Sequence, residues 1–232
     1  MKYIDFISQL IANPQIAFQS LRKNPNFWFP LLTIAVLSAA IFAWFYSIVD
    51  LDWLREQIML SNPQYEEMSE AQRAKAAGII SKNFLMWGSV VGAFVSVPFF
   101  RLLEAVYYLL TGKITRVEGS LKQWFALACW SAFPGVLVLA LMAVAIITRS
   151  NGQITPDSLS MLSLNELFFH TPMGHKWHSL LTSITILNPY LWWLTIVGVK
   201  TFSARSTIYS AVVVLVPIGL IYSGWALFAS LH

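Results

Sequence analysis

Apolar residues run in five long blocks along the chain, separated by polar segments of unequal length. The blocks cover about 27–49, 84–110, 124–148, 180–199 and 207–229. Each block is close to or above the roughly 20 residues that an α-helix needs to cross a bilayer. The pattern therefore predicts an all-α integral membrane bundle of five transmembrane helices, forming one membrane domain over residues 1–232.

The segment before the first block, residues 1–26, has no continuous apolar run, but its apolar side chains recur at helical spacing. These side chains are Tyr3, Phe6, Ile7, Leu10 and Ile11. Polar residues fall between them, which is the pattern of an amphipathic helix. Such an interfacial segment either lies among the lipid headgroups or packs on the bundle, and the sequence leaves both open.

Composition supports the membrane class and excludes several others. The chain is 57% hydrophobic and only 11% charged, whereas soluble domains carry about 25% charged residues. The net charge of +4 does not indicate nucleic-acid binding, because the bases flank apolar blocks, where they orient membrane proteins. The single cysteine, Cys129, excludes an intrachain disulfide and a cysteine-rich metal site.

The distribution of charge between the loops predicts the orientation. The N-terminal segment and the short connections 111–123 and 200–206 are basic, with Asp5 and Glu118 as their acids. Their bases are Lys2, Arg22, Lys23, Lys113, Arg116, Lys122, Lys200 and Arg205. The two longer loops instead carry eight acids against six bases. Because basic loops face the cytoplasm, we expect a multi-pass protein of the cell (inner) membrane with its N-terminus inside and its C-terminus outside.

The second block contains the most unusual residues of the chain. Arg101 and Glu104 lie three apart, so they share one helix face. An ionisable side chain at membrane depth costs about 3 kcal/mol, so the pair needs a shielded interior. The same block begins with Gly88, Gly92 and Ser96, and small residues at this spacing predict close helix packing, either within the chain or in a homodimer.

Four of the blocks contain a proline at a similar depth, about 10–12 residues from the predicted cytoplasmic ends, or roughly 15–18 Å. These prolines are Pro98, Pro134, Pro189 and Pro217. Ser131 and Asn188 lie at or just below this level. Broken helices with polar groups at the midplane form binding sites in transporters, but prolines also shape membrane bundles without binding anything.

A single contact with Glu104 leaves most of the N–H donors of Arg101 without a hydrogen-bond acceptor. We expect further acceptors from Ser131, from Asn188, or from carbonyls freed by Pro134 and Pro189. The sequence does not decide whether this layer is a structural clasp between helices or a functional cavity.

The histidines offer little chemistry. His175 and His178 share a helix face, but no acidic residue or cysteine in the same turn completes a metal shell. They are weak metal candidates, and we expect no metal and no cofactor. The sequence also shows no nucleophile–base pair and no phosphate-binding loop, so we expect no enzyme.

Several short motifs together resemble the bacterial branch of the Yip family of polytopic membrane proteins. They are NPNFWFP at 24–30, GK at 112–113, GSLKQ at 119–123, SAFP at 131–134 and LNPYLW at 187–192. The resemblance implies a five-helix bundle with a cytoplasmic N-terminus. Eukaryotic relatives are associated with Rab-type GTPases, but their acidic N-terminal motif is missing here, so a GTPase partner is not carried over.

Two functional hypotheses follow. The first is a non-enzymatic membrane-organising or interaction protein, whose partners are the lipid bilayer and a second copy or other membrane proteins. The second is a transporter or channel for a small solute or lipid, using the midplane polar layer. A packed interior favours the first hypothesis, and a cavity at the polar layer favours the second.

Overall fold

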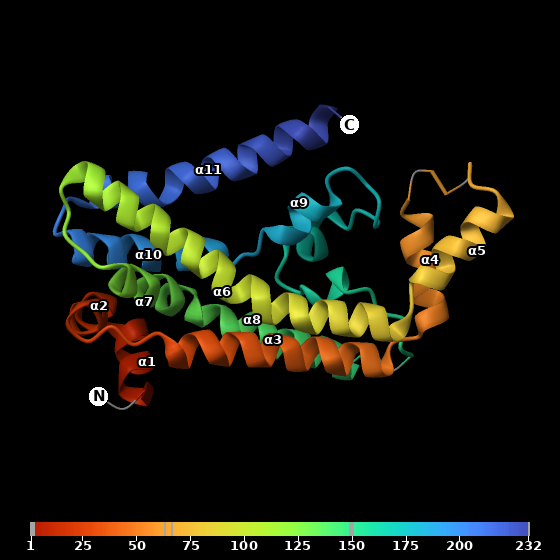
Figure 1. Ribbon diagram of the computed structural model, residues 1–232, viewed down its shortest axis with the longest axis horizontal. Helices are drawn as coiled ribbons and strands as arrows, with labels where there is room; N and C mark the ends of the chain where they lie inside the picture. The colour runs from red at the N-terminus through yellow and green to blue at the C-terminus, as the bar shows by residue number, and fades with distance from the viewer. Residues whose placement is uncertain (1–2, 63, 66, 149–150, 232) are drawn as a thin grey trace. The chain divides into compact units, whose positions relative to one another are not determined.

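The computed structural model describes residues 3–62, 64–65, 67–148 and 151–231 (Figure 1). Lys2, part of the charge pattern, lies outside these residues. The helices are α1 (Tyr3–Ala12), α2 (Pro14–Lys23), α3 (Trp28–Ile48), α4 (Leu51–Leu60), α5 (Glu70–Ile79), α6 (Lys82–Thr115), α7 (Leu121–Ala132), η1 (Phe133–Gly135), α8 (Val136–Thr148), η2 (Asp157–Leu159), η3 (Asn165–Phe169), α9 (His178–Ser183), α10 (Asn188–Ser203) and α11 (Thr207–Leu231).

The predicted all-α membrane fold is confirmed. Within the described residues, four helical stretches are long and apolar enough to cross a membrane: α3, α6, the continuous stretch α7–η1–α8, and α11. The longest is α6, whose 34 residues extend about 51 Å at 1.5 Å per residue. These helices correspond to the first, second, third and fifth apolar blocks.

The fourth block is not the continuous helix that we predicted over 180–199. Helix α9 ends at Ser183, and α10 begins at Asn188 and has only 16 residues. Between them, the chain is extended and bonds to a neighbouring loop: the Ile184 carbonyl accepts from Leu164 N–H, and Ile186 N–H donates to the Leu162 carbonyl. The β-branched run Ile184–Ile186 favours this extended form, and Pro189 in the first turn of α10 is suited to a helix start rather than to a helix centre.

The chain forms two compact units, each built from three separate stretches. Unit 1 comprises Met1–Ala35, Val95–Gly135 and Leu187–Tyr222, and unit 2 comprises Val36–Phe94, Val136–Ile186 and Ser223–His232. Helices α3, α6 and α11 each contribute to both units. The single membrane domain stays a prediction.

Unit 1 has its core where α2, α7 and α10 pack together (Figure 1). Phe18, Leu127 and Leu194 are fully buried there. Gly198 allows this approach, because a Cβ on it would lie 3.2 Å from both Leu127 and Phe18. The core of unit 2 is separate and centres on Phe45, Leu54 and Leu159.

The amphipathic helix α1 packs on the protein, which is one of the two alternatives that the sequence left open. Phe6 and Leu10 are buried, and the Phe6 ring lies 4.3 Å from that of Trp130. The other apolar side of α1, with Ile4 and Ile11, is exposed. Helix α1 therefore belongs to the core of unit 1 and still presents an apolar surface outward.

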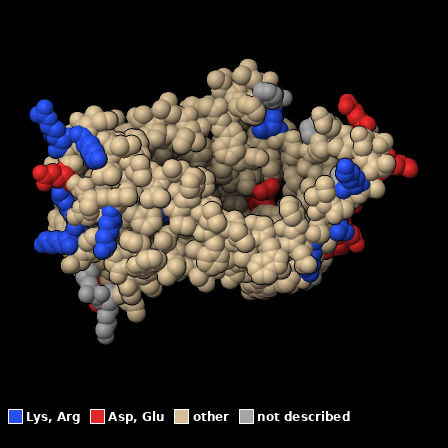
Figure 2. Space-filling model, in the orientation of Figure 1, with Lys and Arg blue, Asp and Glu red and all other residues tan. Residues whose placement is uncertain are grey.

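The three basic segments of the sequence come together at one end of unit 1, which we call the basic end. The Gln123 side chain donates to the Arg22 carbonyl at 2.8 Å, and Arg205 donates to the Thr115 carbonyl at 2.8 Å. Figure 2 shows Lys and Arg side chains gathered at the end where α2 and α7 lie in Figure 1. The structure thus groups the segments that the charge pattern assigned to one side.

Candidate functional site

The predicted charge pair on α6 is formed. An Arg101 N–H donates to Glu104 Oε2 at 2.7 Å. The side chain of Arg101 is 30% exposed, and that of Glu104 is 23% exposed. The second carboxylate oxygen, Oε1, accepts from the Tyr108 hydroxyl at 2.9 Å. Tyr108 is buried and lies one turn beyond Glu104 on the same helix face. Both carboxylate oxygens therefore have protein partners.

The pair lines a cavity of about 710 Å³ within unit 1. Helices α6, α7, α10 and α11 all contribute to its wall. The polar side chains of the wall include Arg101, Glu104, Ser131, Asn188, Thr195 and Tyr222. The apolar side chains include Phe100, Leu103, Leu191, Trp192, Ile218 and Ile221. We call this space the polar cavity.

Several residues of the predicted midplane layer meet in the polar cavity. Arg101, Glu104, Ser131, Asn188 and Pro217 all line it. They come from four helices that are distant in sequence, and counting residues from the helix ends had assigned them a common depth. The charge pair therefore lines the same cavity as polar residues of α7 and α10, while the midplane layer itself stays a prediction.

The other three prolines of the layer have local roles and are not among the described residues of the cavity wall. Pro98 lies inside α6, and Pro189 is in the first turn of α10. Pro134 lies in the 3-10 turn η1 between α7 and α8, where Phe133 N–H bonds to the Trp130 carbonyl.

The hydrogen bonds around the pair differ from those we expected. The Ser131 hydroxyl donates to the carbonyl of Leu127 in its own helix, at 2.9 Å, rather than receiving a bond from Arg101. The Asn188 amide lies 3.5 Å from the Tyr222 hydroxyl across the cavity wall. Among the described residues, Arg101 hydrogen-bonds to Glu104, and the Arg101 side chain lines the cavity while remaining 30% exposed.

The carbonyl freed by Pro217, for which the sequence made no prediction, has a side-chain partner. Pro217 has no N–H, so the Val213 carbonyl four residues earlier loses its helical donor. The Tyr107 hydroxyl of α6 donates to this carbonyl at 2.8 Å. Farther toward the basic end, the hydroxyls of Thr115 and Tyr209 form a hydrogen bond of 2.7 Å. These contacts hold α6 to α11 beside the cavity.

Sequence reasoning missed the tyrosines and Thr195. The spacing of Tyr108 from Glu104, four residues, was a usable signal because it places both on one helix face. Val213 lies four residues before Pro217, and this spacing also indicated that the Val213 carbonyl lacks its helical hydrogen-bond donor. Nothing in the sequence identified Tyr107 as that donor.

The glycine stripe of α6 makes no close packing contact among the described residues. A Cβ on Gly88 or Gly92 would meet no other atom within 4 Å, and both glycines are exposed. Ser96 is half-buried. The stripe is therefore a free surface of the helix rather than an internal helix contact.

The two histidines proposed as weak metal candidates are differently placed. His178 is buried, with Nε2 lying 3.0 Å from Asp157 Oδ2 and Nδ1 lying 2.7 Å from the Thr171 carbonyl. Both ring nitrogens are thus engaged within unit 2. His175 is exposed, and its Nδ1 accepts from Trp177 N–H. Among the described residues, no group of three potential ligands forms a metal site.

The sequence was compared with family models, curated proteins and solved structures. The family model of the Yip1 domain matches residues 8–228, which is nearly the whole chain. No curated protein matches this sequence. No solved structure matches it either.

Proposed function

The chain belongs to the Yip1 domain family, and from its polar cavity we propose that it is a non-enzymatic transmembrane protein that binds a small solute or lipid within the bilayer. The observation that carries this proposal is the 710 Å³ space around Arg101 and Glu104. Its volume is within the range of about 300–1,000 Å³ that small-molecule pockets occupy. Of the two hypotheses from sequence, the cavity favours the transporter or channel.

The guanidinium of Arg101 indicates the polar part of the ligand. It has N–H groups beyond the one bonded to Glu104, and the Arg101 side chain lines the cavity. A guanidinium makes strong, charge-assisted hydrogen bonds to oxygen acceptors, so a ligand that supplies such acceptors is stabilised there. The charges of Arg101 and Glu104 cancel, which favours a neutral or zwitterionic group over a bare ion.

The remaining wall indicates the apolar part. Trp192 and Tyr222 lie 6.2 Å apart, ring centre to ring centre, on α10 and α11. Leu103, Leu191 and Ile218 complete an apolar surface beside the charges. A small amphipathic molecule from the bilayer matches this combination better than a free ion does.

Filling the cavity tests the proposal. Ala132 lines the cavity, so Ala132→Leu adds volume inside it. Ala140 is exposed on α8, so Ala140→Leu makes the same change on the helix surface. We expect native mass spectrometry of protein released from nanodiscs to show one more bound small molecule in the wild type and in Ala140→Leu than in Ala132→Leu. Absence of any bound species from the wild type, or an equal number of bound species in the wild type and Ala132→Leu, contradicts the proposal.

A second candidate function is membrane organisation through contacts between copies of this chain or with other membrane proteins. The exposed face of α6 at Gly88 and Gly92 supports it, because small residues let helices approach closely in lipid. On this candidate, Gly92→Leu abolishes crosslinked dimers in native membranes. The matched change Gly78→Leu, at another open glycine outside the spans, leaves them. Equal crosslinking of both variants excludes this face as an interface.

For location, we propose the cell inner membrane with the basic end of unit 1 facing the cytoplasm. The N-terminus is then cytoplasmic and the C-terminus outside. The grouping of Arg22, Thr115 and Arg205 at one end supports this orientation. The proposal includes no GTPase partner.

A further inference from the structure

A second hollow of unit 1, separate from the polar cavity, lies at the start of the membrane-spanning helices. It has a volume of about 640 Å³ and is open to the outside. Its walls come from the link between α2 and α3, from α6 and from the first turns of α7. We call it the Lys122 groove.

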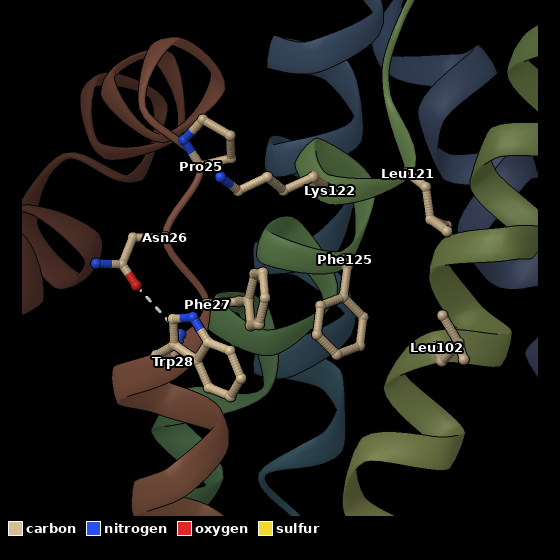
Figure 3. A pocket seen from close by; sticks show the side chains of 8 residues that line it. All are labelled: Pro25, Asn26, Phe27, Trp28, Leu102, Leu121, Lys122 and Phe125. Atoms are coloured by element: carbon tan, nitrogen blue, oxygen red, sulfur yellow. Dashed lines mark hydrogen bonds between the residues drawn. The ribbon is translucent and has the colours of Figure 1, made fainter.

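The groove is polar at one end and apolar along its length. Figure 3 shows Lys122 reaching from the first turn of α7 toward Pro25, while the rings of Phe27 and Phe125 lie farther along and Leu102 of α6 lies beyond them. The two phenylalanine rings pack edge to face at 4.8 Å. A charged site followed by an apolar track matches the polar headgroup and the apolar chain of an amphiphile that enters from the membrane surface.

The walls are held in place without any ligand. Trp130 Nε1 donates to the Asn26 carbonyl at 2.7 Å, and the Asn26 side chain accepts from Trp28 N–H at 3.1 Å. The Gln123 amide fixes the first turn of α7 to the end of α2 through the Arg22 carbonyl. A groove that exists before binding loses little entropy when it is occupied.

The positive charge of the Lys122 groove indicates what kind of molecule it binds. Among the described residues, Lys122 has neither an ion-pair nor a hydrogen-bonding partner, and its side chain is exposed in the groove. The surrounding basic end contributes further bases, with Glu118 and Asp5 as the described acids of the same segments. These bases are Arg22, Lys23, Lys113, Arg116, Lys200 and Arg205. The exposed indole of Trp28, on the groove wall, is typical of the headgroup level of a bilayer.

From these observations we propose that the Lys122 groove binds one anionic phospholipid, with its phosphate at Lys122 and an acyl chain along Phe27, Phe125 and Leu102. The site is independent of the polar cavity and of its ligand. It gives the protein a fixed lipid at the basic end, in addition to the general attraction of a basic surface for anionic lipids.

Native mass spectrometry of the purified full-length chain in detergent tests this site, with phosphatidylglycerol and phosphatidylcholine of identical acyl chains as probes. We expect the wild type to prefer phosphatidylglycerol and Lys122→Gln to weaken phosphatidylglycerol binding about five-fold. Lys122→Arg should restore it. Lys113, exposed at the same end but outside the groove wall, is the matched control, and Lys113→Gln should change binding less than about two-fold.

The apolar track has its own test. Leu102→Gln should weaken both lipids equally, because it alters the chain track and leaves the headgroup site intact. Equal effects of Lys122→Gln and Lys113→Gln mean that diffuse charge alone attracts the lipid, and this result overturns the site. No preference for phosphatidylglycerol in the wild type, or unchanged binding by Leu102→Gln, also overturns it.

Discussion

Replacing Glu104 by glutamine separates the charge of the pair from its shape. In Glu104→Gln, the new amide keeps the size of the side chain and an acceptor for the Tyr108 hydroxyl, but it leaves Arg101 as an uncompensated cation. Removing one partner of a fully buried pair costs about 3–5 kcal/mol. Because Arg101 and Glu104 retain 30% and 23% of their exposure, we expect a smaller loss of about 2–3 kcal/mol. For a chain of this size, that corresponds to a fall in Tm of roughly 4–12 °C.

Removing the whole polar group should cost less than removing one charge. A buried pair replaced by apolar residues of similar volume often leaves stability unchanged. Tyr108 must be included, because its buried hydroxyl donates to Glu104 and an orphaned hydroxyl costs about 1–3 kcal/mol. The triple variant Arg101→Met, Glu104→Leu, Tyr108→Phe should therefore melt closer to the wild type than Glu104→Gln does.

The assay is the loss of the monodisperse peak after heating in detergent, followed by fluorescence. Glu118→Gln is the control, since Glu118 is an exposed glutamate of the same unit. It should melt within about 2 °C of the wild type. The reasoning is refuted if the triple variant melts below Glu104→Gln, or if all variants melt together. Equal melting also means that the pair serves binding rather than stability.

Three further predictions concern other parts of the chain. Cysteines introduced at the exposed positions Gln153 and Glu118 test orientation: in intact cells, an impermeant thiol reagent should label the first and not the second, and the reverse result inverts the topology. Phe6→Asp, in the core of unit 1, should speed amide exchange throughout α1, whereas Ile4→Asp on the exposed side should not; equal exchange in both variants means that α1 is held by lipid. His178→Leu removes the contacts of the His178 ring with Asp157 and Thr171, so the loop around η2 should become more sensitive to limited proteolysis. Unchanged cleavage means that other contacts hold this loop.

The sequence predicted the features that depend on composition and helical geometry. Long apolar blocks identified the spanning helices, and the spacing of Arg101 and Glu104 placed both on one face of α6. These features follow from rise per residue and periodicity, which are fixed by the backbone. Counting residues from the helix ends also assigned Ser131 and Asn188 to the level of the pair, and this common depth in the membrane stays a prediction.

Features that depend on what surrounds a side chain were not predictable in this way. An apolar face looks the same whether it meets lipid or protein, since lipid tails are as apolar as leucine, so the pattern could not decide how Phe6 and Leu10 are buried. The partner of the carbonyl freed by Pro217 is a hydroxyl from another helix, and one sequence does not show which helices are neighbours. The break before α10 was missed because apolar character outweighed the β-branched run Ile184–Ile186.

The central claim is that the polar cavity holds a ligand at Arg101. Cryo-electron microscopy of the protein in lipid nanodiscs, bound to a rigid antibody fragment, tests it most directly. We predict non-protein density between α6, α10 and α11, within hydrogen-bonding distance of the Arg101 guanidinium, in the wild type and not in Ala132→Leu. A wild-type map in which side chains of α6 and α11 fill this space, leaving no room for a ligand, contradicts the account.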